Sequence, residues 1–119
     1  DASAQAAYEA LECAVAAKDV PGYHRESRNF HLALVSPCGM RRLLGMFESA
    51  WNMTEPLQPM AHIPVRTRVS LHRDHDEMLA AFVARDAPAL LEAAHAHHER
   101  LRSSLSSLPR HTGLFADRE

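Results

Sequence analysis

Apolar side chains recur every three or four residues along most of this chain, and nowhere do they alternate with polar ones over five or six positions. The first pattern is typical of helices that bury one face, and the lack of alternation argues against half-buried strands. We therefore expect an all-α fold, an antiparallel bundle of about five to six helices. A chain of 119 residues is long enough to form one such domain with its own core.

Prolines, glycines and capping residues divide this pattern into five predicted helices. Their approximate ranges are 3–17, 21–35, 40–54, 68–84 and 87–108. Three prolines between positions 55 and 65 predict a loop that crosses the bundle. We expect the domain to span 1–108 and the segment 109–119 to be a C-terminal tail. The helices on either side of Asp86 are joined by almost no loop, so they must form an antiparallel hairpin.

Charge and composition argue against several classes of protein. The formal net charge is −2 and no predicted helix carries a basic cluster, which disfavours strong nucleic-acid binding by this chain. No apolar run is long enough to cross a bilayer, and no secretory signal opens the sequence. Cys13 and Cys38 have neither the number nor the spacing of a disulfide framework. We expect a soluble, cytoplasmic protein with no membrane partner.

Two histidines lie at matched heights on the predicted hairpin. His75 precedes Asp86 by eleven residues, and His97 follows it by eleven. At 1.5 Å per residue both lie roughly 16 Å from the turn, and both fall on the apolar faces of their helices. One inward histidine is more often an ordinary core residue, but two that meet are costly to bury unless a metal ion or a ligand satisfies them.

His31 is the third candidate, because it shares an inward face with Tyr23, Ser27, Phe30 and Leu34. Three imidazoles from three helices of a bundle form a site for a divalent metal ion. Zinc is the first choice by ligand type, with nickel or manganese as alternatives. Because only neutral imidazole binds a metal, we expect binding to fade as the pH falls through roughly 6.5.

The remaining histidines are expected to lie at the surface or to support the site without binding the metal ion. Those predicted on polar faces or in the tail are His24, His72, His95, His98 and His111. His62 lies in the proline-rich loop, from where it reaches at most the mouth of the bundle. The acidic residues that flank His75, which are Asp74, Asp76 and Glu77, are expected on the polar side of their helix.

No catalytic signature is present, because the sequence has no nucleophile elbow, no glycine-rich phosphate loop and no cysteine in a convincing triad. We therefore do not expect an enzyme. Two alternatives stay open. A three-histidine zinc site with an open water position is also the inner shell of some hydrolases. A purely structural dimerisation bundle needs neither metal nor ligand.

Two stretches carry a resemblance to a known family: NFHLALVSPCGMRRLLGMF at 29–47 and HDEMLAAFVARDAPALLEAAHAHHERL at 75–101. They resemble the effector-binding domain of GntR-family bacterial transcription regulators, of the FadR C-terminal (FCD) type. The resemblance implies a helical bundle that holds a divalent metal ion and senses a small effector, often a carboxylate or a sugar acid. It also implies a homodimer. The ligand positions of metal-binding members fall on Ser27, His31, His75 and His97, and Tyr23 joins them as an expected effector-binding residue.

The chain departs from the family pattern at Ser27, where an aspartate or asparagine is usual. A neutral hydroxyl is a poor ligand for a divalent ion, so we expect weaker metal binding, or an effector carboxylate in the vacant position. From the resemblance we expect the family's N-terminal winged helix-turn-helix and the first helix of the sensing domain to lie outside this chain. Operator DNA is therefore expected to be bound only through that absent domain.

Overall fold

The computed structural model describes residues 2–54, 56 and 59–107, and every regular element in these residues is helical. The order is α1 (Ala2–Ala16), α2 (Val20–Val35), the 3-10 turn η1 (Ser36–Cys38), α3 (Arg41–Thr54), the 3-10 turn η3 (Pro59–His62), α4 (Val65–Val83) and α5 (Ala87–Ser106). The all-α helical bundle expected from the sequence is confirmed. The expected tail at 109–119 lies outside the described residues.

Aspartate caps set two of the helix starts. The carboxylate of Asp19 accepts a hydrogen bond from the backbone N–H of Gly22, and that of Asp86 accepts one from Ala89, both at 3.1 Å. A proline occupies the first turn of α2 and of α5, where its missing N–H costs nothing. Each cap fixes the point at which the short connection from α1 enters α2, or that from α4 enters α5.

Helix α4 begins three residues earlier than expected, at Val65 instead of 68. The carbonyl of Pro64 accepts the first helical hydrogen bond, from Arg68 N–H at 3.0 Å. A helix can therefore start directly after the last proline of the loop, because Pro64 needs only to accept this hydrogen bond and not to donate a backbone N–H.

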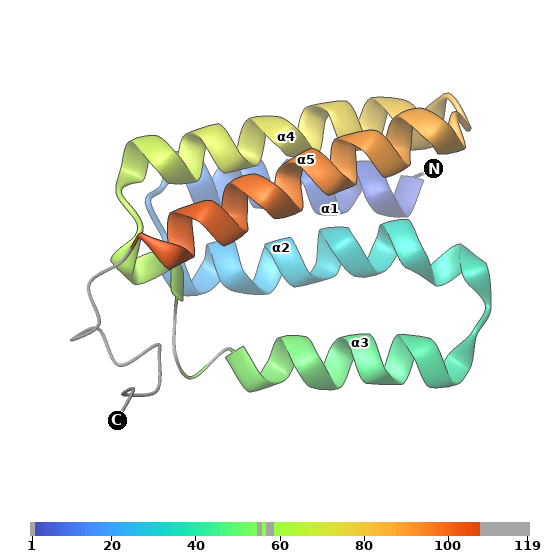
Figure 1. Ribbon diagram of the computed structural model, residues 1–119, viewed down its shortest axis with the longest axis horizontal. Coiled ribbons are helices and arrows are strands. Elements are labelled where there is room, and N and C mark those ends of the chain that lie inside the picture. The colour runs from blue at the N-terminus through green and yellow to red at the C-terminus, as the bar shows by residue number, and fades with distance from the viewer. Residues whose placement is uncertain (1, 55, 57–58, 108–119) are drawn as a thin grey trace.

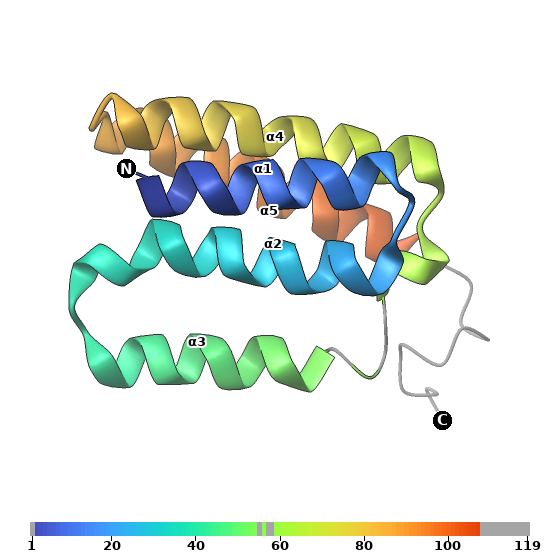
Figure 2. The same cartoon turned by 180° about the vertical axis from the view of Figure 1, so that it is seen from behind.

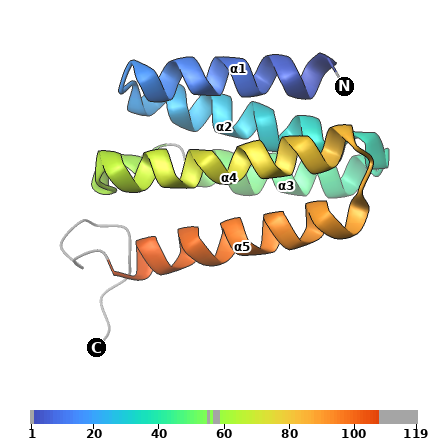
Figure 3. The same cartoon turned by 90° about the horizontal axis from the view of Figure 1, so that it is seen from above.

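The helices form two antiparallel hairpins, α1–α2 and α4–α5, with α3 running alongside α2 (Figure 1). Seen from behind, α1 lies between α4 and α2 (Figure 2). Seen from above, α1 and α5 lie on opposite sides of the bundle (Figure 3). The core is built chiefly from α1, α2 and α4, and its largest fully buried side chains are Leu11, Phe30, Leu71 and His75. None of the described helices is long and apolar enough to cross a membrane.

Helix α3 contributes no buried residue to this core. Its apolar side chains occupy two adjacent faces, and the outer one is open to solvent, with Met46 69% and Met53 77% exposed. The inner face carries Phe47 and Trp51, which line a cavity between α3 and the rest of the bundle. Helix α3 therefore acts as a wall of that cavity and not as part of the packed core.

Candidate metal centre

The three histidines expected to meet do so in the structure. His31 on α2, His75 on α4 and His97 on α5 each offer a nitrogen, and these nitrogens all lie within 4.8 Å of one another. Their ring centroids are 4.6 Å apart for His75 and His97, 5.1 Å for His31 and His75, and 5.5 Å for His31 and His97. This is close enough for one ion to contact all three side chains.

The α4–α5 hairpin sets the height of two of these rings. Asp86 caps α5 at the turn, and Arg85 before it adopts a left-handed φ of 57°, which reverses the chain direction within three residues. His75 and His97, each eleven residues from Asp86, then face one another across the hairpin. His75 is completely buried and His97 is 8% exposed.

In each of the three rings, the Nδ1 atom lies within hydrogen-bond distance of a neighbouring atom. The Nδ1 of His31 lies 2.7 Å from the carbonyl oxygen of Ser27, and that of His97 lies 3.0 Å from a carboxylate oxygen of Asp74. Both acceptors hold the proton on Nδ1 and leave the Nε2 lone pair available. Histidines that bind metal ions are usually oriented in this way by a hydrogen bond to the other ring nitrogen. The arrangement therefore suits a borderline metal ion such as zinc.

His75 differs, because its Nδ1 lies 3.2 Å from the Nδ1 of His72. Its Nε2 is buried and has no hydrogen-bond partner in the described structure. If His75 donates its Nδ1 proton to His72, the Nε2 of His75 keeps a free lone pair. A metal ion at Nε2 would satisfy an atom that is otherwise expensive to bury.

Burial keeps the rings of His31 and His75 neutral. It lowers the pKa of His31 to about 4, an effect that the hydrogen bond to the Ser27 carbonyl opposes and the neighbouring His97 reinforces. Burial also lowers the pKa of His75 far below its usual value, and the adjacent histidines add to the effect. Both imidazoles are therefore in the form that binds metal ions well below neutral pH.

Asp74 is a functional residue that the sequence analysis misplaced. It was expected on the polar side of its helix, but only 6% of it is exposed. Arg100 binds it through two nitrogens, with the Nε of Arg100 3.0 Å from the oxygen that also faces His97. Burial alone would raise the pKa of Asp74, but the hydrogen bonds from Arg100 and His97 outweigh it and hold the pKa below its usual value. The count from Asp86 places Asp74 at nearly the height of His75, but it does not show that α5 covers this side of α4.

Two of the histidines expected on polar faces are instead buried, namely His24 and His72. His72 stacks on the ring of Tyr8 at 5.2 Å, and Tyr8 donates a hydrogen bond to Asp76. The polar face predicted for this part of α4 is covered by α1, so packing of another helix overrides the pattern. His62, His95 and His98 are exposed as expected, and His111 lies outside the described residues.

A cavity of about 460 Å³ adjoins the three histidines and is bounded by α2, α3, α4 and α5. Of the residues expected to contact an effector, Tyr23, Ser27, His31 and His97 line it. His75 does not line it and sits behind the other rings. Cavities of about 300–1,000 Å³ are typical of small-molecule sites.

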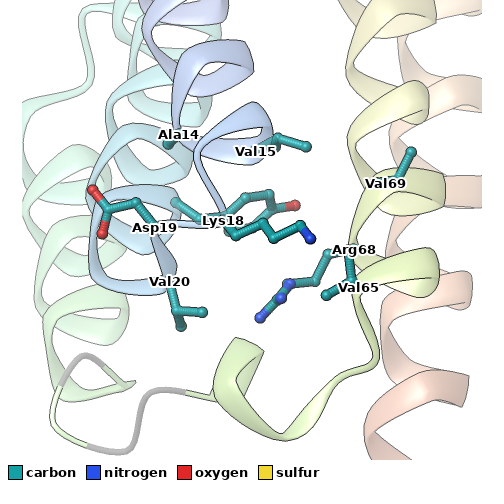
Figure 4. Close-up of a pocket in the computed structure, with 9 residues that line it drawn as sticks. Ala14, Val15, Lys18, Asp19, Val20, Val65, Arg68 and Val69 are labelled. Atoms are coloured by element: carbon teal, nitrogen blue, oxygen red, sulfur yellow. The ribbon is translucent and has the colours of Figure 1, made fainter.

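A second pocket lies where α1 turns into α2, and α4 closes it (Figure 4). It is lined by Val15, Lys18, Val65, Arg68 and others, but its volume is only about 10 Å³. That volume accommodates at most one water molecule. A further pocket of about 540 Å³ lies at the α4–α5 turn, and no histidine lines it. The cavity beside the histidines is therefore the candidate binding site for a small molecule, because of both its size and its place.

Replacement of Asp74 by asparagine should weaken metal binding about 10- to 100-fold, as is typical when the partner of a metal-binding histidine is changed. The neutral amide no longer holds His97 electrostatically and leaves Arg100 without its ion pair. The measurement is a zinc titration against a competing chelator. Glu77→Gln, which makes the same charge change at an exposed position of α4, is the control. Unchanged zinc affinity in folded Asp74→Asn would show that Asp74 does not orient His97.

Comparison with known proteins adds one finding. The model of a protein family described as the FCD domain matches residues 1–100. The match covers α1 to α4 and the greater part of α5, and so includes His31, Asp74, His75 and His97. Searches of the curated proteins and of the solved structures gave no match.

Proposed function

Because the chain belongs to the FCD domain family, the C-terminal effector-binding domains of GntR-family regulators, we propose that it senses a small carboxylate bound at a divalent metal ion. His31, His75 and His97 hold the ion, with zinc as the first choice and nickel or manganese as alternatives. The observation that carries this proposal is the geometry of the three rings: their nitrogens lie within 4.8 Å of one another, and the Nδ1 of His31 and of His97 faces an oxygen acceptor, which leaves Nε2 to bind.

Three imidazoles leave at least one coordination position open. The metal ion, when bound, supplies a positive charge and an exchangeable position for an anionic group. Ser27 lines the cavity one helical turn before His31, and its neutral hydroxyl, 3.4 Å from the Nδ1 of that ring, cannot supply the anionic ligand itself. We therefore assign the vacant position to the carboxylate of the effector.

The effector acts through the walls of the cavity. Its binding favours one arrangement of α2, α3 and α5 over others, with a coupling free energy of about 1–3 kcal/mol, as is typical of such switches. In a cytoplasmic regulator that works as a homodimer, this arrangement sets the spacing of two DNA-binding domains on an operator. Those domains are not part of the sequence described here.

The rival function, a zinc hydrolase, requires a general base near the open metal position. Asp74 is the carboxylate nearest to the histidines, but its oxygens are already bound by Arg100 and His97. No aspartate or glutamate lines the cavity in the described part of the chain. These contacts favour a sensor over an enzyme.

The proposal is tested by thermal unfolding of the metal-free chain with added zinc and acetate. A ligand that binds only the folded form stabilises it by about 2.7 kcal/mol at 100 times its Kd. We expect zinc to raise the melting temperature, and acetate to raise it further only when zinc is present. Ser27→Asp should bind zinc about tenfold more tightly and lose the response to acetate, because its own carboxylate fills the position. Stabilisation by acetate without zinc would contradict the proposal.

A further inference from the structure

The lining of the main cavity is unusually poor in polar groups for a site that would receive a sugar acid. No lysine, arginine, aspartate or glutamate is among its lining residues. Beyond the histidines the walls are mainly apolar, with Phe47 and Trp51 on α3, Leu71 and Met78 on α4, and Leu101 and Leu105 on α5. The anionic end of an effector can therefore bind only at histidines, which are His24 and His98 besides those of the metal centre, and the rest of the molecule faces mainly hydrocarbon.

Three hydroxyl groups line the cavity, those of Tyr23, Ser27 and Thr54, and the last two are already committed or lie close to the histidines. The hydroxyl of Thr54 donates to the carbonyl of Trp51 at 2.7 Å. The hydroxyl of Ser27 lies 3.4 Å from the Nδ1 of His31. A polyhydroxylated effector would bring several hydroxyls into this space, and each one left without a partner weakens binding by about tenfold.

An aromatic wall stands next to the metal centre. The Trp51 ring lies 5.1 Å from His31 and 5.6 Å from Phe47, measured between ring centroids. A ring attached to a carboxylate at the histidines would reach these side chains, and centroid distances of about 4.5–7 Å are favourable for aromatic pairs. Trp51 also has a buried Nε1 without a hydrogen-bond partner in the described structure, which could donate to a substituent.

We propose that the effector of this chain is an aromatic monocarboxylate and not a sugar acid. Its carboxylate lies at the three histidines, and its ring lies against Trp51 and Phe47. This inference rests on the proposed function, since it takes the anionic end to be held at the metal centre. It goes further because it assigns an aromatic ring to the rest of the effector, from the aromatic side chains of α3 that line the cavity.

Trp51 is the only tryptophan of the chain, so its fluorescence reports on the wall of the cavity. The zinc-loaded chain is titrated by calorimetry with phenylacetate, gluconate and acetate, while Trp51 emission is followed in parallel. We expect phenylacetate to change the emission and to bind about 100-fold more tightly than gluconate or acetate. Equal or tighter binding of gluconate would overturn the inference, as would binding of phenylacetate that leaves Trp51 emission unchanged.

Variants of two neighbouring residues of α3 test the contact itself. Phe47→Ala should weaken phenylacetate about tenfold and leave the affinities for zinc and acetate unchanged. Met46→Ala, at a 69% exposed position outside the cavity, should change none of these affinities. An unchanged phenylacetate affinity in Phe47→Ala would overturn the inference.

The two proposals fail in different ways. If zinc and acetate bind but phenylacetate has no advantage, only the assignment of the aromatic body is wrong. If the folded chain binds no zinc, the proposed function is wrong, and the effector assignment that rests on it falls as well.

Discussion

Replacement of His75 by alanine is expected to lower the affinity for zinc by about 100-fold or more. Structural zinc sites of four ligands are worth about 10–16 kcal/mol, so one ligand accounts for roughly 2.5–4 kcal/mol. His75 is the deepest of the three rings, and its unpartnered Nε2 has no other role in the described structure. The affinity is measured by competition with a chelator of known strength.

The control for this substitution is His95→Ala, which removes an exposed imidazole from α5 and should leave zinc binding unchanged. Because His75 is fully buried, its loss also opens space in the core and is expected to lower the stability of the metal-free chain. His97→Ala, at a residue 8% exposed, is therefore measured alongside, with circular dichroism as the check on folding. Wild-type zinc affinity in both folded variants would show that these rings do not bind the ion.

The sequence predicted those features that local periodicity and chain reversal determine. Asp86 and the proline in the first turn of α5 predict a tight turn between the two helices. Because His75 and His97 are equally far from that turn in sequence, they are predicted to lie side by side, and they do. The inward orientation of His31 was predicted from its position on the apolar face of α2, and the structure places it with the other two histidines. These predictions succeeded because a helix has a fixed rise and a fixed angle per residue.

Other features depend on which helix packs on which face, and periodicity does not contain that information. His72 and Asp74 lie on two sides of α4 that were expected to be polar, yet α1 covers the first and α5 the second. In α3 the structure places Phe47 on an inner wall and leaves Met46 on an outer face that is open to solvent. A sequence pattern shows that a face is apolar, but it does not show how much of it another helix covers.

The network around Asp74 is relevant to the proposed metal centre, which has no carboxylate ligand of its own. The negative charge of Asp74 lies beyond His97, where it would strengthen that imidazole as a ligand, and Arg100 offsets the charge. If Ser27 were an aspartate, a second negative charge would lie next to the cavity. The neutral serine instead leaves room for an anionic effector, so the departure from the family pattern and the proposed sensing role have the same physical basis.

Acidification of the metal-free chain from pH 7 to pH 4 is expected to lower its free energy of unfolding by about 3 kcal/mol through His31 alone. Burial lowers the pKa of His31 in the folded chain to about 4, while the unfolded chain keeps the ordinary value near 6.5. Between these two values the unfolded form binds more protons, so stability rises with pH. His75, whose pKa is lowered even further, acts in the same direction.

Urea unfolding at pH 7, 5.5 and 4 measures this loss. His31→Asn should remove about 3 kcal/mol of the difference between pH 7 and pH 4, and His95→Asn, at an exposed site, should leave it unchanged. The same shift corrects the range expected from the sequence for metal binding. Because folded His31 stays neutral down to about pH 4, zinc should still bind the folded chain at pH 5.5, below the roughly 6.5 of an ordinary imidazole. A stability that is flat from pH 7 to pH 4 would mean that water reaches these rings and keeps their pKa near that of free imidazole.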